Sequence, residues 1–297
     1  MHRTAFITIV GRPNVGKSTL MNHLLGEKVA IVSSKPQTTR NRIAGILTKG
    51  DDQYVFIDTP GVHHAKNKLG EFMMKSVRSS VGAADAIILI AEAGYPAGET
   101  EKNLIAQIKK TDLPSILVLN KIDLVNREKL AETIAGYAAL HNFDAVVPTC
   151  AETGKNVEEV LEEASNFLYE GEWMFDEDSL TDQPERQIAA EIIREKMLRT
   201  LSDEIPHGTA VVIEEFTEEK NLIRIRAEIF CEKQSHKGII VGKKGEMLKK
   251  IGTYAREDME AFFGQNVYLN LWVKVKEKWR DDMLSLNNFG FKPEDVR

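Results

Sequence analysis

Residues 11–18, with the sequence GRPNVGKS, have the composition and spacing of a phosphate-binding loop. They match the P-loop pattern GxxxxGK[ST] and lie between a predicted strand, Ala5–Val10, and a predicted helix. The glycines allow backbone N–H groups to point at phosphate oxygens, and the helix N-terminus adds a partial positive charge. We therefore expect Lys17 to reach the β- and γ-phosphates of a nucleotide and Ser18 to ligate Mg²⁺. The residues expected around the phosphates are Gly11, Arg12, Pro13, Asn14, Val15, Gly16, Lys17, Ser18 and Thr19.

A second motif, Asp58-Thr59-Pro60-Gly61, follows the predicted strand Tyr54–Ile57. A carboxylate at a strand end can hold Mg²⁺ through a water molecule, and this is the role that we expect for Asp58. The N–H group of Gly61 can donate to a γ-phosphate. We expect Thr59 and Pro60 to border the same nucleotide site.

A third motif, Asn120-Lys121-Ile122-Asp123, follows the predicted strand Ser115–Leu119 and favours guanine as the base. The carboxylate of Asp123 can accept hydrogen bonds from guanine N1–H and from its exocyclic amine, a donor pair that adenine lacks. Taken alone, the four residues could also be a helix start, but their position two strands after Asp58 favours the base-binding interpretation. The loop after the last predicted strand is expected to cap the base, with a hydrogen bond from the backbone N–H of Ala151. The residues expected there are Cys150, Ala151 and Glu152.

Short apolar runs alternate with amphipathic stretches in the first half of the chain, which predicts an α/β fold. Helices expected between the strands include Leu69–Val81 and Glu99–Lys110. This order predicts a mostly parallel sheet with helices on both faces. Residues 42–49 are an expected edge strand. The strands expected in the sheet are Ala5–Val10, Tyr54–Ile57, Ala86–Ala91, Ser115–Leu119 and Ala145–Pro148.

The composition changes after the predicted helix Val157–Leu168. Residues 169–184 are acidic and show little periodicity, so we interpret them as a linker. This gives a nucleotide-binding domain over residues 1–168, an acidic linker over 169–184 and a second domain over 185–297. The second domain has a different rhythm, with alternating strands and a helix over Glu246–Phe263, which predicts a smaller α+β fold.

The second domain contains IVGKKGEMLKKI at residues 240–251, which resembles the KH pattern IxGxxGxxIxxI. In a KH domain, the GxxG turn lies against the sugar-phosphate chain of single-stranded RNA. The alternative is a solvated, lysine-rich turn between two helices. Charge favours RNA, because residues 233–256 hold seven Lys and Arg against one Glu in a chain of net charge −6. The expected RNA-binding residues are Lys237, Ile240, Val241, Gly242, Lys243, Lys244, Gly245, Lys249 and Lys250.

The whole-chain composition sets further limits. The 297 residues are 42% hydrophobic and 28% charged, which is ordinary for a globular protein and unlike a disordered one. Two cysteines far apart, Cys150 and Cys231, form no disulfide framework and favour a reducing cytosol. The first residues lack a full signal peptide, and the longest apolar runs fall well short of the ~20 residues that span a bilayer.

These motifs together resemble the Era family of translation-factor-class GTPases, over nearly the whole chain. The resemblance implies a P-loop GTPase domain followed by a type II KH domain. It also implies GTP hydrolysis, binding to 16S ribosomal RNA near its 3′ end, and a role in assembly of the 30S subunit. One motif departs from the family pattern, because Cys150 stands where a serine is usual. We expect base binding to survive this change, since Ala151 keeps its position.

The resemblance places the first switch loop at Pro36–Arg40. Thr39 is the candidate for contact with Mg²⁺ and the γ-phosphate, with Thr38 as the alternative and turn capping as a third possibility for both. Val62 stands where related GTPases keep a glutamine that orients the attacking water, so slow intrinsic hydrolysis is expected. The resemblance also suggests that Asn14 helps to bind K⁺ as an activator; the alternative is a turn-forming asparagine. The expected catalytic residues are Asn14, Lys17, Thr39, Asp58 and Gly61.

The resemblance implies a cytoplasmic monomer that also associates peripherally with the inner face of the cell membrane. Neither a spanning helix nor a lipidation signal points to the membrane. Two other functions remain open at this point. One is a P-loop ATPase or small-molecule kinase with an accessory domain. The other is a GTPase whose second domain binds protein.

Overall fold

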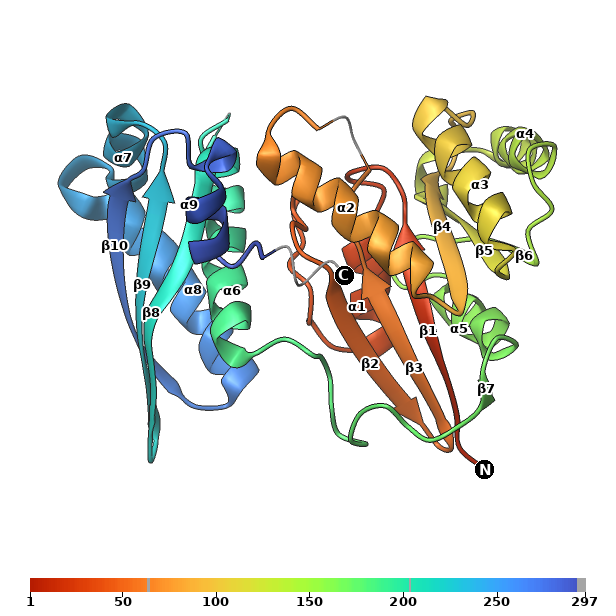
Figure 1. The fold of residues 1–297 in the computed structure, drawn as a ribbon, viewed down its shortest axis with the longest axis horizontal. Coiled ribbons are helices and arrows are strands. Elements are labelled where there is room, and N and C mark those ends of the chain that lie inside the picture. The colour runs from red at the N-terminus through yellow and green to blue at the C-terminus, as the bar shows by residue number, and fades with distance from the viewer. Residues whose placement is uncertain (63–64, 203, 293–297) are drawn as a thin grey trace. The chain divides into compact units, whose positions relative to one another are not determined.

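Two units, each with its own sheet, make up the part of the chain that the structure describes, residues 1–62, 65–202 and 204–292 of a computed structural model (Figure 1). The first unit contains Met1–Ala65 and Met73–Asp182. The second contains Lys66–Phe72 and the described residues from Gln183 onward. The finer division at residues 168 and 184 remains a prediction.

The sheet of the first unit has the strand order β2-β3-β1-β4-β5-β6. Neighbouring strands are parallel except β2, which runs antiparallel to β3. The fold thus confirms the predicted mostly parallel α/β architecture. The bounds are β1 Arg3–Val10, β2 Ile43–Lys49, β3 Asp52–Asp58, β4 Ala86–Glu92, β5 Ser115–Asn120 and β6 Ala145–Pro148.

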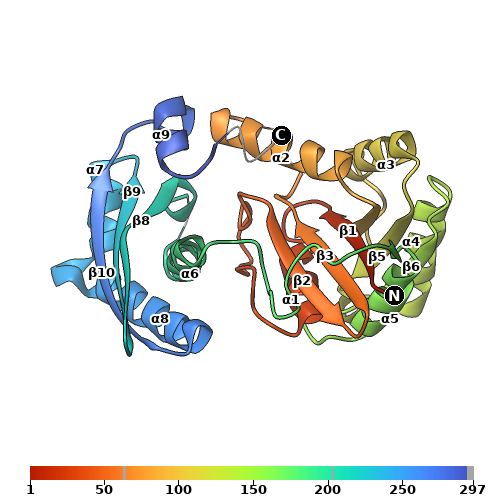
Figure 2. The same ribbon diagram turned by 60° about the horizontal axis from the view of Figure 1, so that its bottom comes forward.

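Helices cover both faces of this sheet (Figure 2). On one face α1 and α5 pack against the strands, and on the other α2, α3 and α4 do so. Burial on both sides explains the uninterrupted apolar run Ala86–Ala91, which has no exposed surface. The bounds are α1 Lys17–Leu25, α2 Lys68–Gly82, α3 Glu99–Thr111, α4 Arg127–Ala138 and α5 Val157–Ser165.

Parallel strand order decides where the motifs meet. The loops after β1, β3, β5 and β6 all leave the carboxyl edge of the sheet. In an open α/β sheet, ligands bind at this edge. The four motifs, which are up to about 140 residues apart in sequence, are therefore brought to one side of the unit.

Residues 169–182, which we call the strap, lie on the first unit. The strap begins as β7, Tyr169–Glu170, paired antiparallel with the start of β1, and its Thr181 bridges Gly45 of β2. Gln53 of β3 binds the middle of the strap: its side chain accepts from the N–H groups of Met174 and Phe175. Backbone hydrogen bonds and the packing of Phe175 thus attach this acidic stretch to the sheet. Its role as a linker between domains remains a prediction.

The second unit is a three-stranded sheet in the order β10-β9-β8 with helices against it. Strands β8 and β9 are antiparallel, whereas β9 and β10 are parallel. The described part thus confirms the predicted small α+β domain. The bounds are α6 Glu185–Thr200, β8 Thr209–Glu219, β9 Leu222–Cys231, α7 Gln234–Val241, α8 Glu246–Phe263, β10 Asn266–Val275 and α9 Met283–Asn288.

Short 3₁₀ helices occur at Ile122–Leu124, Pro206–Gly208, Lys243–Gly245 and Trp279–Asp281. Among the described residues, no helix combines the length and apolar character needed to cross a membrane.

Candidate functional site

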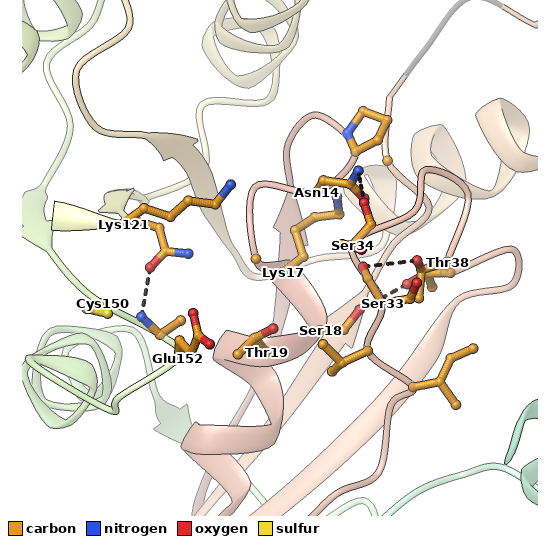
Figure 3. Close-up of a pocket in the computed structure, with 18 of the residues that line it drawn as sticks. Asn14, Lys17, Ser18, Thr19, Ser33, Ser34, Thr38, Lys121, Cys150 and Glu152 are labelled. Atoms are coloured by element: carbon orange, nitrogen blue, oxygen red, sulfur yellow. Dashed lines mark hydrogen bonds between the residues drawn. The ribbon is translucent and has the colours of Figure 1, made fainter. Parts of the chain in front are cut away.

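A cavity of about 620 Å³ opens at the carboxyl edge of the first unit's sheet (Figure 3). Its volume suits a ligand of nucleotide size. The lining residues come from the P-loop, the segment between α1 and β2, and the loops after β3, β5 and β6. They are Pro13, Asn14, Gly16, Lys17, Ser18, Thr19, Ile31, Val32, Ser33, Ser34, Gln37, Thr38, Thr39, Gly61, Asn120, Lys121, Asp123, Leu124, Cys150, Ala151 and Glu152.

Lys17 opens helix α1 and is held inside its own loop. Its Nζ donates to the carbonyl oxygens of Gly11, at 3.2 Å, and Arg12, at 2.8 Å. The residue is only 6% exposed. Burial lowers the pKa of Lys17 to about 8, although the nearby Asp58 carboxylate opposes the shift. An ammonium group so poorly solvated will gain strongly from a phosphate that enters the cavity.

Three oxygens converge beside this lysine. Ser18 Oγ donates to Asp58 Oδ2 at 2.6 Å, and Thr39 Oγ1 donates to the same oxygen at 3.1 Å. The two hydroxyl oxygens are 3.0 Å apart. Asp58 is fully buried, and its Oδ1 has no hydrogen-bond partner among the described residues. Burial raises the pKa of Asp58. Hydroxyl and carboxylate oxygens are the ligands that Mg²⁺ prefers, so this cluster fits such an ion.

The two threonines of the switch segment differ in what their hydroxyl groups contact. Thr38 Oγ1 donates to the carbonyl oxygen of Lys35 at 2.6 Å, as a turn-capping residue does. Thr39, in contrast, joins Ser18 and Asp58. Both line the cavity. The geometry thus favours Thr39 over Thr38 as the residue near a metal ion.

Asn14 also lines the cavity, and its side-chain amide donates to the carbonyl oxygen of Ser34 at 2.7 Å (Figure 3). This bond links the P-loop to residues 31–34, which the sequence analysis did not identify as part of the site. No sequence motif marks that segment. The only signal was the Ser33-Ser34-Lys35-Pro36 stretch, whose composition is typical of a turn.

Asn120 connects three motif loops at the other end of the cavity. Its Nδ2 donates to the carbonyl oxygen of Val15 at 2.8 Å, and its Oδ1 accepts from the N–H of Ala151 at 2.8 Å. The Thr149 hydroxyl donates to the same Oδ1. Gly16 lies so close that a Cβ there would be 2.2 Å from Asn120 Nδ2. Asn120 therefore stabilises the cavity by connecting the P-loop with the loop that follows β6.

Asp123 and Cys150 lie on the outer wall of this end of the cavity. Asp123 is exposed, in the position expected for a carboxylate that meets a base. Lys121, in the left-handed conformation with φ 64°, donates from Nζ to Glu92 Oε2 at 3.1 Å. Cys150 is buried, and its backbone N–H donates to the Lys155 carbonyl oxygen. Backbone groups shape this turn, so that survival of base binding without the serine hydroxyl remains the prediction.

Some predicted nucleotide residues lie behind the cavity wall. The Arg12 side chain pairs with Glu101, a buried carboxylate at the start of α3. Thr59 Oγ1 donates to the Ile9 carbonyl oxygen. Six of the residues predicted for the nucleotide site are not among those that line the cavity: Gly11, Arg12, Val15, Asp58, Thr59 and Pro60.

Gly61 approaches the P-loop very closely. A Cβ at this position would lie 2.6 Å from the backbone of Pro13, so only glycine fits. The next residue, Val62, donates its backbone N–H to the Gly11 carbonyl oxygen at 3.1 Å. Its aliphatic side chain has no hydrogen-bonding group that could orient a water molecule.

The GKKG turn lies between α7 and α8 in the second unit. Gly242 has φ 73° and ψ 177°, a conformation open almost only to glycine, and Lys244 is left-handed with φ 53°. Lys243, Lys244, Lys249 and Lys250 are exposed. Within the described residues, none of these four lysines belongs to an ion pair. They are thus available to a polyanion.

Three other residues predicted to bind RNA, all on α7, are less exposed than these lysines. Ile240 has no exposed surface and packs in the core with Ile251, as expected of an apolar position that supports the flanking helices. Its place in the RNA site remains a prediction. Lys237 is half-buried on α7, and Val241 packs against the same core.

Two family descriptions match the chain. One, a 50S ribosome-binding GTPase, matches residues 6–121, and the other, a KH domain, matches residues 204–280. The GTPase Era of Clostridium kluyveri is 49% identical over 293 residues, covering 98% of this chain and 100% of the relative. The GTPase Era of Caldanaerobacter subterraneus subsp. tengcongensis is 49% identical over 292 residues, covering 98% of each.

Two solved structures are similar over almost the same length. Era in complex with MgGDPNP and nucleotides 1506–1542 of 16S ribosomal RNA superposes with a TM-score of 0.94 at 37% identity, covering 98% of this chain and 99% of that one. A tyrosine-to-alanine variant of Aquifex aeolicus Era bound to GDP and AlF₄⁻ gives a TM-score of 0.94 at 38% identity, covering 97% of this chain and 99% of that one.

Proposed function

The chain belongs to the Era family and is a GTPase, and from this premise we propose which of its residues act on GTP and that its second unit binds the 3′ end of 16S ribosomal RNA. The observation that carries the proposal is the convergence of four motif loops on one cavity, with a separate lysine-rich turn in the second unit. Fold similarity to an RNA-bound Era supports the second part.

We assign the phosphate end of the cavity to Lys17 and the N-terminus of α1. The loop backbone and the helix dipole attract the phosphate oxygens, and Lys17 exchanges its two carbonyl partners in part for phosphate. At the opposite end, Asp123 selects guanine by accepting from N1–H and the exocyclic amine. The backbone N–H of Ala151 already donates to Asn120 Oδ1. This bond stabilises the loop that follows β6.

Mg²⁺ fits the cluster of Ser18, Thr39 and Asp58, and a relative was solved with MgGDPNP. Ser18 and Thr39 would hold the ion directly, and Asp58 would hold it through water. The ion would neutralise charge on the β- and γ-phosphates when bound. The hydroxyl groups of Ser18 and Thr39 can keep donating to Asp58 while their oxygen lone pairs are offered to the ion.

Hydrolysis of GTP by water yields GDP and phosphate. We assign the N–H of Gly61 as a donor to the γ-phosphate, and the close approach of Gly61 to Pro13 of the P-loop supports this role. Val62 contributes no water-orienting group, which supports a slow intrinsic rate. We propose K⁺ as a further activating cation held in part by Asn14, which bridges the P-loop and Ser34. Added positive charge near the β- and γ-phosphates would stabilise the transition state.

The GKKG turn is the proposed RNA clamp. Two glycines and a left-handed Lys244 place backbone N–H groups and two exposed lysines on one turn. Such a turn tracks the backbone of about four nucleotides of single-stranded RNA. Lys249 and Lys250 on the first turns of α8 extend the positive charge beyond the turn.

The proposed partners follow from this RNA. Because 16S ribosomal RNA belongs to the small subunit, we propose that the protein acts as a monomer on the 30S subunit during its assembly, in the cytoplasm. We also propose that the protein associates peripherally with the inner face of the cell membrane, as the family resemblance implies. Sedimentation with purified 30S particles and with anionic vesicles would separate these two partners.

The central experiment measures GTP hydrolysis in K⁺ and in Na⁺ buffer, with and without RNA of the 16S 3′ end. We expect RNA to bind, and K⁺ to accelerate hydrolysis over Na⁺. ATP hydrolysed as fast as GTP would contradict the guanine site, and an identical rate in the two salts would contradict the K⁺ role. RNA that fails to bind at low salt would favour a protein-binding second unit instead.

A further inference from the structure

The last residues of the strap occupy the free edge of β2, beside the point where the switch segment enters the sheet. The Leu180 carbonyl oxygen accepts from the Ile46 N–H at 2.9 Å. Thr181 Oγ1 donates to the Ala44 carbonyl oxygen at 2.6 Å, and the Ala44 N–H donates to Asp182 Oδ1 at 3.3 Å. Because the opposite edge of β2 pairs with β3, the first residues of β2 are held from both sides.

These contacts lie only a few residues from the metal-binding cluster. Thr39 is bonded to Asp58, and Asp58 lies opposite Ile43 in the β2–β3 register. Between Thr39 and Ala44, the Arg42 guanidinium approaches Asp182 to 3.7 Å. A continuous series of contacts therefore connects the hydroxyl of Thr39 with the carboxylate of Asp182.

The strap also has a second attachment, which does not involve the switch segment. Gln53, on β3, accepts from two strap N–H groups and donates to the Phe175 carbonyl oxygen at 2.9 Å. The Trp173 indole donates to the Asp51 carbonyl oxygen. Because residues 173–175 are fixed near β3, a movement of β2 would change mainly the position of residues 180–182. The next residue along the chain, Gln183, begins the second unit.

We propose that residues 180–182 form a clamp that couples the switch segment to the RNA-binding unit, which rests on the function proposed above. When a γ-phosphate and Mg²⁺ hold Thr39, the start of β2 stays in place and the clamp stays closed on Ala44 and Ile46. When Thr39 is released, Ile43 and Ala44 can leave the edge, the clamp opens, and the backbone entering Gln183 gains freedom. RNA affinity then depends on the bound nucleotide, and by linkage RNA changes the affinity for the GTP analogue by the same factor.

The first test compares RNA affinity in the GDPNP–Mg²⁺ and GDP states of the full chain, using a fluorescent RNA of the 16S 3′ end. Asp182→Ala and Thr181→Val each remove a clamp bond, and the matched control Asp178→Ala removes an exposed carboxylate from the same strap. We expect wild type and the control to share one ratio of affinities. In each clamp variant, the difference in RNA affinity between the two nucleotide states should be about fivefold smaller than in the wild type. This is the effect of one hydrogen bond on an equilibrium constant. Equal affinities in the two states of the wild type, or an unchanged ratio in both clamp variants, would overturn the proposal.

A second readout needs no RNA. Hydrogen exchange at the Ala44 and Ile46 amides, which the clamp protects, should be slower with GDPNP–Mg²⁺ than with GDP. The Met174 and Phe175 amides, bonded to Gln53, should exchange equally in both states. Identical exchange at Ala44 and Ile46 in both states would overturn the clamp. If RNA binds in neither state, the RNA-binding function fails, while this measurement still decides whether the clamp responds to the nucleotide.

Discussion

Lys17 in the first unit and the lysines of the GKKG turn in the second differ in how the fold holds them. Lys17 is buried, donates to two backbone carbonyl oxygens and has its pKa lowered by burial to about 8. Lys243 and Lys244 extend from a tight turn into solvent. Burial of the Lys17 ammonium costs solvation free energy, but it prepares the site for one kind of ligand. The ammonium groups of Lys243 and Lys244 stay hydrated.

This difference teaches where specificity and affinity come from. A preorganised, poorly solvated site discriminates strongly, because a wrong ligand leaves buried polar groups unpaired. A solvated cationic turn attracts any phosphate backbone, and its strength falls with salt. The nucleotide site should thus respond to single-atom changes, and the RNA turn to total charge. Each of the following predictions tests one side of this contrast.

The largest effect is expected from Lys17→Ala, which removes the buried cation beside the phosphates. Hydrolysis should fall by about 10²–10³-fold, as for the loss of a preorganised donor to a developing charge. Single-turnover GTP hydrolysis measures it, with Lys102→Ala, an exposed lysine on α3, as the control. A loss of less than tenfold would mean that the burial of Lys17 is structural only.

Asp123→Asn should weaken GTP binding by about a hundredfold, because the carboxylate loses its charge and half of its match to guanine. Xanthosine triphosphate carries a carbonyl where guanine has its amine, so the variant should bind it better than the wild type does. Competition against a fluorescent nucleotide gives both affinities. If GTP and xanthosine triphosphate keep their wild-type order, the base lies elsewhere.

Replacing Lys243 and Lys244 with Asp should reduce RNA affinity by at least about tenfold and leave GTP affinity unchanged. The corresponding double alanine variant should lower the slope of log K against log salt by about 1.4, or 0.7 for each lost phosphate contact. Fluorescence anisotropy at several salt concentrations measures the slope. If the variant has a reduced affinity but the same salt slope as the wild type, the turn contributes shape rather than charge.

The two glycines of the turn should respond unequally to alanine. Gly242→Ala places a Cβ 2.7 Å from Met247 Cβ and 2.9 Å from its backbone nitrogen, whereas at Gly245 a Cβ meets nothing within 4 Å. We expect Gly242→Ala to cost about 1–3 kcal/mol of unfolding free energy and Gly245→Ala about 1 kcal/mol. Chemical denaturation of the full chain, followed by probes in each unit, compares them. If the two substitutions lower the unfolding free energy equally, the positive φ angle, and not the contact with Met247, accounts for the loss of stability.

The smallest effect is expected from Cys150→Ser, which restores the residue usual in the family. Because backbone N–H and carbonyl groups form this turn, with Cys150 N–H bonded to Lys155, GTP affinity should change by less than about twofold. Isothermal titration measures it, with Ala151→Ser at the adjacent buried position as the comparison. A large gain in affinity would assign the serine hydroxyl a role that the backbone does not cover.

Much of the site was predictable because its chemistry lies in local motifs. The P-loop, Asp58–Gly61, the proposed base-binding motif Asn120–Asp123 and the GKKG turn each carry their residue types within a few positions. Strand positions also followed from apolar runs, and β6 begins and ends as predicted. The strap was different, since an acidic stretch without periodicity reveals nothing about backbone bonds to a sheet edge more than a hundred residues earlier.

By itself the sequence determined the fold class and which loops carry the chemistry, since periodicity and short motifs depend on neighbours along the chain. Only the tertiary structure decided which of Thr38 and Thr39 joins Asp58, and that Asn120 connects the P-loop with the loop at Ala151. It also decided that residues 180–182 clasp β2. The reason is physical: these are hydrogen bonds between distant segments, and their geometry exists only once the order of strands in the sheet has set the distances.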